Sequence, residues 1–194
     1  MAQLKTKNIF IRSFSTPVLF RAWLLQHHEQ QEGIWLRLYK KGTNKKSINY
    51  DQALDEALCF GWIDGQSKSY DQDSWIQKFT PRRKRSMWSK RNREHVARLI
   101  KEKKMTVAGL KEVAAAKADG RWVHAYDSAK NMTIPKDFLA ELAKHKRAAA
   151  FYKTLNKANL YAIAWRLQTA KKPETRKARM EAILSKLKKK QTLH

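Results

Sequence analysis

Hydrophobic positions near the start of the chain recur at a spacing that predicts a helix. Thr16 followed by Pro17 is typical of a helix start, with a side-chain acceptor at the cap and proline at the first helical position. The apolar side chains that then follow at helical spacing are Leu19, Phe20, Trp23 and Leu24. We expect Gly33 to end this helix, because glycine readily adopts the left-handed conformation that closes helices.

Residues 34–39 alternate in character, which predicts a half-buried strand. Its two faces are Ile34, Leu36 and Leu38 inside and Trp35, Arg37 and Tyr39 outside. A short helix is expected next, with Asp51 as its cap and Gly61 at its end. The inner face of that helix is Ala53, Leu54, Ala57 and Leu58.

Residues 62–69 and 74–80 predict a short antiparallel hairpin that Pro81 ends, since proline lacks a backbone donor. From there the pattern is helical. The predicted helices and their starting residues are 90–103 after Ser89, 107–118 after Thr106, one from Pro135, 147–154, 157–170 after Asn156, and one from Pro173. We expect Gly120 to close the second of these, and its inner face to be Val107, Leu110, Val113 and Ala114.

These elements predict an α+β fold that is predominantly helical. A small α/β amino-terminal part with a short antiparallel hairpin is followed by a helical bundle. The polar stretch before Pro135 is the expected division. It separates an α+β domain at 1–126 from a basic helical region at 134–194.

Composition excludes several classes of protein. Seven Trp, seven Phe and six Tyr among 194 residues argue against a disordered chain, and a single cysteine, Cys59, cannot form an intramolecular disulfide. No apolar run is long enough for a transmembrane helix, and the amino end lacks the apolar core of a signal peptide. A cytoplasmic location is therefore expected.

Charge is concentrated in one part of the sequence. The chain has 42 Lys or Arg and 17 Asp or Glu, a formal net charge of +25. Residues 1–75 hold 10 basic and 8 acidic residues, whereas residues 76–104 hold 12 and 2. Such a field attracts polyanions, including nucleic acid, an anionic membrane surface or an acidic protein. The alternative is a lysine-rich surface that only keeps the protein in solution.

The basic residues at 82–93 are mostly arginine, which binds phosphate with two parallel donors and stacks on rings. The start of the helix after Ser89 adds backbone donors that favour anions. Trp62, Trp75 and Trp88 either wall a groove for stacking beside this cluster or belong to the core.

Asp64 is the single acid in an apolar run between Gly61 and Gly65. If it is buried it must be paired, and Arg82 and Arg83 are the expected partners. The alternative is that Asp64 binds the backbone of residues 65–67 and fixes the turn.

Several multi-residue blocks resemble a known family. They are ALDEALCFGWIDG (53–65), FTPRR (79–83), SMWSKRN (86–92), AKADGRW (116–122), YAIAW (161–165) and AKKPETRKAR (170–179). In this order, over nearly the whole chain, they resemble the YdeI/OmpD-associated family. The resemblance implies a link to bacteriocin protection or envelope stress, and it assigns no reaction and no catalytic residue.

Other residue types give weaker signals. His27 and His28 are adjacent and point about 100° apart on a helix, so a surface helix end is favoured over a metal site. Cys59 fits a small core residue better than a nucleophile. No phosphate loop, dinucleotide fingerprint or nucleophile elbow is present, and we expect no cofactor and no metal.

Three functions remain open, and the first is favoured: a non-enzymatic protein that binds a polyanion. The second is an enzyme or small-ligand protein for an anionic compound, with Asp64 as general base and Arg82 as anion clamp. The third is recruitment to an anionic membrane or an acidic protein through residues 172–194. The alternative for the last helix is that it packs its apolar row on the domain. The candidate site residues are Trp62, Asp64, Arg82, Arg83, Arg85, Ser86, Trp88, Lys90, Arg91 and Asn92.

Overall fold

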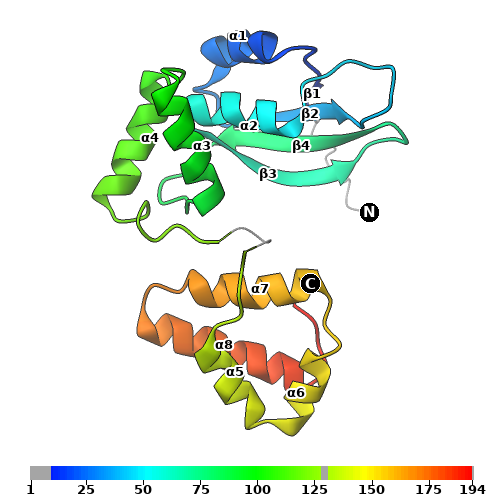
Figure 1. Cartoon of the computed structure of the whole chain (residues 1–194), viewed down its shortest axis with the longest axis vertical. Coiled ribbons are helices and arrows are strands. Elements are labelled where there is room, and N and C mark those ends of the chain that lie inside the picture. The colour runs from blue at the N-terminus through cyan, green and yellow to red at the C-terminus, as the bar shows by residue number, and fades with distance from the viewer. Residues whose placement is uncertain (1–9, 128–130, 194) are drawn as a thin grey trace, which may run out of the picture. The chain divides into compact units, whose positions relative to one another are not determined.

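A computed structural model describes residues 10–127 and 131–193. The chain divides into two compact units. The first unit consists of Met1–Trp88 and Asn92–His124, and the second of Ser89–Arg91 and Ala125–His194. The first unit combines helices with a small sheet, and the second unit is all-helical (Figure 1). The predicted α+β fold that is mainly helical is therefore confirmed.

The first unit is built on a four-stranded sheet. In the order in which they lie side by side, the strands are β1 (Ile11–Arg12), β2 (Ile34–Tyr39), β4 (Ser74–Pro81) and β3 (Trp62–Ser69). β1 is parallel to β2, and the other neighbours are antiparallel. The hairpin predicted from the sequence is confirmed as β3 and β4, with a register shift between Asp64 and Ser67.

Four helices accompany the sheet: α1 (Pro17–His27), α2 (Tyr50–Cys59), α3 (Lys90–Lys101) and α4 (Val107–Ala118). Aromatic contacts show that α1 and α2 cover the same face of the sheet. Phe20 of α1 lies 6.1 Å from Phe79 of β4, ring centre to ring centre, and Tyr50 of α2 lies 6.1 Å from Trp75. The core of the unit therefore lies between this face and the two helices.

The strand predicted at 34–39 is confirmed, but it is more buried than the alternation implies. Trp35, on the face away from α1 and α2, is only 9% exposed. The ammonium groups of Lys68 and Lys78 lie 5.0 and 5.7 Å from the centre of its ring. Long lysine side chains cover apolar surface while their charges stay in water, which explains the burial.

Helix boundaries confirm some caps and correct others. Thr16 caps α1 as predicted, but the helix ends at His27, well before Gly33. α2 begins at Tyr50, and its cap is Asn49 rather than Asp51. The reason is a reciprocal capping box, in which the Asn49 side chain accepts from the Gln52 backbone N–H and the Gln52 side chain accepts from that of Asn49.

α4 has the predicted cap, Thr106, and Val113 is buried as predicted, but the rest of its inner face differs. Val107 and Leu110 are 84% and 43% exposed, while Gly109 is buried. A Cβ atom at Gly109 would lie 2.2 Å from the carbonyl oxygen of Cys59. Because the helix approaches the end of α2 this closely, Gly109 faces inward at the contact, and Val107 and Leu110 face outward.

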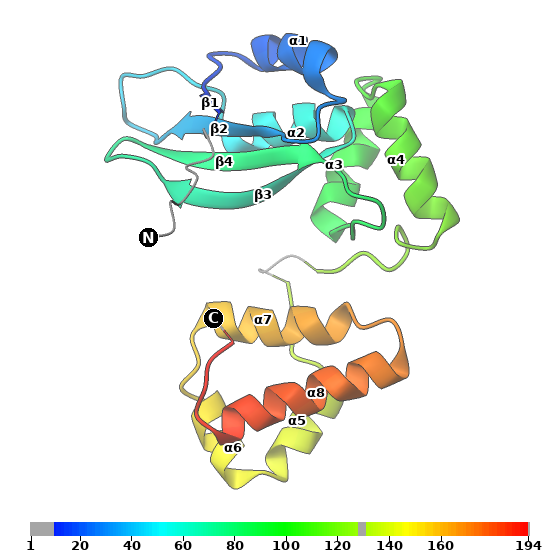
Figure 2. The same ribbon diagram turned by 180° about the vertical axis from the view of Figure 1, so that it is seen from behind.

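The second unit contains four helices: α5 (Lys136–Ala143), α6 (Lys146–Tyr152), α7 (Lys157–Gln168) and α8 (Pro173–Lys188). In both views α8 lies between α7 and the α5–α6 pair (Figure 1, Figure 2). Residues from all four helices form the core: Phe138, Leu142, Ala148, Ile163, Leu167, Ile183, Leu184 and Leu187. The last helix, α8, thus packs its apolar row on the unit, which is the alternative that the sequence offered to contact with a membrane.

In the described residues no helix is both long enough and apolar enough to cross a membrane.

Candidate functional site

The loop that leaves β4 is anchored by Arg82. Its backbone N–H donates to the carbonyl oxygen of Gly61 at 3.1 Å. Its side chain is nearly buried, lies 3.4 Å above the ring centre of Trp88, and donates to the carbonyl oxygen of Met87 at 3.2 Å. A guanidinium held against an indole by these contacts stabilises the loop from within.

The same loop is held from its other side by residues 119–122. The rings of Trp88 and Trp122 meet edge to face, 5.0 Å apart at their centres. Arg121, 5% exposed, donates to the carbonyl oxygen of Ser86 at 2.8 Å and forms an ion pair with Asp119 at 2.6 Å. The loop therefore has fixed contacts at both ends, although it is neither helix nor strand.

Between these anchors the loop turns outward. The backbone N–H of Ser86 donates to the carbonyl oxygen of Arg83 at 2.9 Å, and Arg85 has a positive φ of 67°. Arg83, Lys84 and Arg85 are all exposed. None of the three forms an ion pair with a carboxylate in the part of the chain that the structure describes. We call Arg83, Lys84 and Arg85 the basic loop.

Two more cations lie beside the anchoring tryptophan. The guanidinium of Arg93 and the ammonium of Lys117 lie 5.3 and 5.7 Å from the ring centre of Trp122, which is half-buried. Positive charge from α3 and α4 thus flanks this aromatic ring. Lys117 and Trp122 lie in the block AKADGRW, and Arg93 directly follows the block SMWSKRN, but local spacing does not show that they meet.

The structure divides the predicted site residues between the two units. Lys90 and Arg91 are exposed and are grouped with the second unit, whereas Asn92, 6% exposed, belongs to the first. Lys90 forms an ion pair with Asp127 at 2.7 Å, and its backbone N–H donates to the carbonyl oxygen of Tyr126. One backbone N–H at the start of α3 is therefore already hydrogen-bonded, whereas free donors were expected there.

Trp62 and Trp88 do not wall a groove, because they are 0% and 1% exposed. Trp62 donates its indole N–H to the carbonyl oxygen of His28 at 2.8 Å and packs edge to face on Trp23. The core alternative for these two tryptophans is confirmed. Burial of this kind excludes stacking of a ligand on either ring without local opening.

Asp64 has neither of the partners that the sequence suggests. Its carboxylate accepts a hydrogen bond from the hydroxyl of Tyr50 in α2 at 2.8 Å. Arg82 instead contacts Trp88, and Arg83 is exposed. Asp64 and Arg82, the acid and the cation of the enzyme hypothesis, therefore have separate surroundings.

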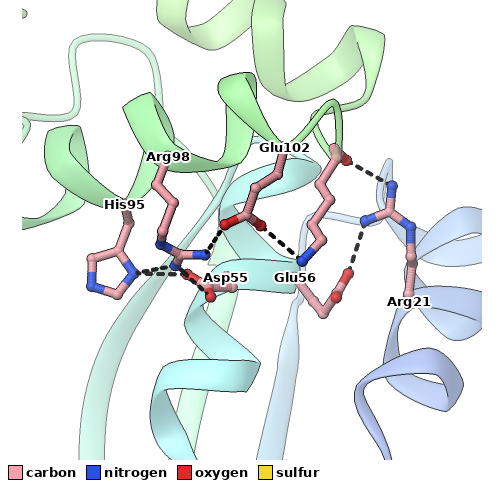
Figure 3. A network of polar contacts seen from close by, with 7 residues as sticks. Arg21, Asp55, Glu56, His95, Arg98 and Glu102 are labelled. Carbon is pink, nitrogen blue, oxygen red and sulfur yellow. Dashed lines mark hydrogen bonds and ion pairs between the residues drawn. The ribbon is translucent and has the colours of Figure 1, made fainter.

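A polar network that local patterns do not reveal joins α2 to α3 (Figure 3). Asp55 accepts from His95 Nδ1 at 2.7 Å and from Arg98 at 2.6 Å. Glu102 accepts from Arg98 and pairs with Lys104, and these hydrogen bonds lower the pKa of Glu102. About 40 residues separate Asp55 from its partners. The network stabilises helix packing, since each charge within it is neutralised by a neighbour.

The thiol of Cys59 has the surroundings of a core residue. Cys59 is fully buried, and burial raises the pKa of its thiol to about 11. A thiol that stays protonated at neutral pH is a poor nucleophile. The prediction that Cys59 is a core residue is confirmed.

His27 and His28 form a half-buried helix end. Their Nδ1 atoms contact the carbonyl oxygens of Trp23 and Leu24 at 2.8 and 3.1 Å, so each ring is held by its own helix. Among the described residues no three His, Cys, Asp or Glu side chains gather in a way that would hold a metal ion.

Comparisons with known proteins match two different parts of the chain. Residues 12–112 match a family described as Domain of unknown function (DUF8412). Residues 131–190 match the family described as Bacteriocin-protection, YdeI or OmpD-Associated, which confirms the predicted resemblance over a narrower range. The blocks at 161–165 and 170–179 lie within this second match, while the CFGWIDG and FTPRR blocks lie within the first. No curated protein and no solved structure matches the chain.

Proposed function

We propose that this chain, which belongs to the family described as Domain of unknown function (DUF8412) and at residues 131–190 matches the family described as Bacteriocin-protection, YdeI or OmpD-Associated, binds polyanions, nucleic acid foremost. The proposed contact surface is the basic loop, Arg83, Lys84 and Arg85, of the first unit. Neither family description names a ligand, so the proposal rests on the charge and the geometry of the chain itself.

One observation carries the proposal. Three consecutive exposed cations project from a loop that is fixed by Arg82 on Trp88 and by Arg121 on Ser86, and they have no carboxylate partner in the described part of the chain. A surface that serves only for solubility needs no buried anchors. Fixing the loop in advance lowers the entropy that the cations lose when they bind phosphates.

The surroundings of the loop add to its field. Arg93 and Lys117 flank Trp122 on the same side of the unit as the anchors, because Trp122 contacts Trp88 directly. Arginine next to phosphate forms short, charge-assisted hydrogen bonds, which are about twice as strong as neutral ones. The net charge of +25 also speeds the encounter with any polyanion.

The proposal includes a cytoplasmic location, where nucleic acid is accessible to the protein. Fractionation of cells that produce the tagged chain tests this part. Recovery of the protein with the soluble cytoplasmic fraction is expected, and recovery with membranes would favour the membrane-surface alternative.

The binding experiment compares the wild-type chain with the variant R83A/K84A/R85A by fluorescence anisotropy on a short labelled DNA duplex. We expect the variant to lose at least about tenfold in affinity, because each charge-assisted hydrogen bond to phosphate contributes about 1.5–3 kcal/mol. The three side chains are exposed, so the variant should keep its fold and its unfolding temperature.

The matched control is K41A/K101A/K111A, which removes the same charge from exposed positions of the same unit. A control that weakens binding as much as the loop variant would show that only total charge matters. That result would refute the basic loop as the contact surface.

A further inference from the structure

The second unit contains a cavity of about 290 Å³ between α7, α8 and the carboxyl-terminal residues. The side chains that matter for its chemistry are Trp165 and Arg166 of α7, Arg179, Ile183 and Lys186 of α8, and Leu193. None of them belongs to the surface proposed above, and all lie within one unit. The cavity therefore has to be explained separately.

The apolar part of this cavity is preformed. Ile183 is 3% exposed and belongs to the core of the unit, and Leu193 packs against the same core. The backbone N–H of Leu193 donates to the side-chain oxygen of Asn159, itself 4% exposed, at 2.8 Å. This bond fixes the segment that forms one wall, so the cavity does not depend on a loose chain end.

Trp165 is the aromatic wall. It is 37% exposed, and its ring meets that of Tyr126 edge to face with centres 6.3 Å apart. Large aromatic side chains are usually buried, and this one is held in place while part of its ring remains accessible. A held and accessible indole is a surface on which a planar ring can stack.

The polar part of the cavity is cationic. The guanidinium of Arg179 donates from one nitrogen to the carbonyl oxygen of Arg166 at 2.8 Å and to the hydroxyl of Thr169 at 3.1 Å. These two bonds orient the side chain and leave its other donors for a ligand. No carboxylate in the described residues pairs with Arg179, Arg166 or Lys186.

A second cavity in the same unit provides a contrast. Its volume is about 500 Å³, and its lining includes Glu141 and Glu181 as well as His145, Lys177 and Lys188. Two carboxylates among its cations make that cavity a poor anion site. The cavity beside Trp165 combines an aromatic ring with three cations and contains no acid.

We infer that the cavity beside Trp165 binds a nucleotide-like ligand, with a planar ring stacked on Trp165 and a phosphate held by Arg179 and Lys186. Small-ligand cavities range from about 300 to 1,000 Å³, so this one, at about 290 Å³, is at the small end and suits a mononucleotide better than a larger cofactor. The same ring and phosphate occur in a free nucleotide and in one nucleotide of a single strand. The inference does not rest on the proposed function of the basic loop.

The test is isothermal titration calorimetry, in which the full chain is titrated with adenosine 5′-monophosphate and, separately, with adenosine and with inorganic phosphate. We expect the monophosphate to bind at least about tenfold more tightly than either part alone, because stacking and phosphate contacts both contribute. Equal affinity for inorganic phosphate, or no binding of the monophosphate, would overturn the inference.

Variants locate the site. Lys186 is exposed, so K186A removes a cation without disturbing the core, and R179A removes the oriented guanidinium. Each should weaken binding of the monophosphate severalfold, while the control K177A, from the other cavity, should leave it within about twofold. Thermal unfolding of R179A separates loss of the site from loss of the fold, and unchanged binding in K186A and R179A together would contradict the assignment.

Two further experiments distinguish a free nucleotide from a nucleotide within a strand, and this inference from the proposed function of the basic loop. Competition by a short oligo(dA) strand that exceeds the monophosphate in affinity would identify the nucleotide as part of a strand, and weaker competition would identify a free nucleotide. R83A/K84A/R85A should bind the monophosphate as the wild type does. If duplex binding is lost in that variant and the wild type binds no monophosphate, this inference fails while the proposed function stands.

Discussion

Arg82 and Arg83 are neighbours in the sequence but differ in burial. Arg82 is 7% exposed and stacks on Trp88, whereas Arg83 is exposed and has no ion pair in the described part of the chain. The sequence places both in one cluster, since residue type alone does not distinguish an anchoring arginine from a ligand-binding one. A measurement of stability does distinguish them.

Arg82→Ala should destabilise the first unit by about 2–3 kcal/mol, because it removes a desolvated cation–ring contact and a charged hydrogen bond. Arg83→Ala should change stability by no more than about 0.5 kcal/mol, as exposed substitutions usually do. Urea unfolding followed by circular dichroism measures both. Equal losses in the two variants would show that Arg82 is not an anchor.

Elements were predictable from the sequence where a single local signal defines them. The caps Thr16, Thr106 and Asn156 and the hairpin of β3 and β4 are confirmed, because capping and strand alternation depend on neighbouring residues. The inner face of α4 was predictable only in part: Val113 is buried as expected, whereas Val107 and Leu110 are exposed. It depends on how closely that helix approaches Cys59, a contact between residues far apart in the sequence.

Gly109→Ala should destabilise the first unit by about 1–3 kcal/mol. Alanine favours helix by about 1 kcal/mol, but a Cβ atom 2.2 Å from the Cys59 carbonyl oxygen forces α4 away from α2. Chemical denaturation measures the change. The control is Ala114→Gly at an exposed position of α4, which should cost only the propensity difference of about 1 kcal/mol. A more stable Gly109→Ala protein would contradict the close approach.

An ion pair between α5 and α8 makes the second unit sensitive to acid. Arg176 binds the carboxylate of Asp137 at 2.7 Å and lowers the pKa of Asp137 below its usual value near 4. A lowered pKa contributes stability above the unfolded value and loses it as the pH falls through the folded value. Asp137 is 54% exposed, so the contribution is limited to about 0.5–1 kcal/mol.

Asp137→Asn should therefore lower the unfolding temperature of the second unit at neutral pH, and its effect should shrink in acid as the wild-type carboxylate becomes protonated as well. Differential scanning calorimetry at neutral and at acidic pH measures the difference. A difference that persists undiminished in acid would mean that Asp137 acts through packing rather than through its charge.

At the scale of the whole molecule, the distribution of charge along the chain was predictable, but the contacts between segments far apart in the sequence were not. The sequence locates the excess of cations after residue 76. It does not show that Ser89–Arg91 group with the second unit, which follows from the bridge between Ser89 and Tyr126 and the hydrogen bond of Lys90 to the same residue. Likewise, Arg121 reaches Ser86 across 35 residues, beyond any local pattern.

The family matches fit this organisation. Residues 12–112 and 131–190 match different families, and they fall almost entirely in the first and second unit respectively. Each unit also contains its own candidate anion site, the basic loop in one and the cavity beside Trp165 in the other. The two sites can therefore be tested by separate variants of the same full chain.

The most direct test of the central claim is the salt dependence of duplex DNA binding by the wild-type chain and by R83A/K84A/R85A, measured from about 50 to 200 mM salt. Each phosphate contact on duplex DNA contributes about 0.9 to the slope of log K against log salt. If the three cations of the basic loop each contact a phosphate, the variant slope is shallower by about 2 to 3. Identical slopes for the two proteins would contradict the claim that the basic loop binds the polyanion.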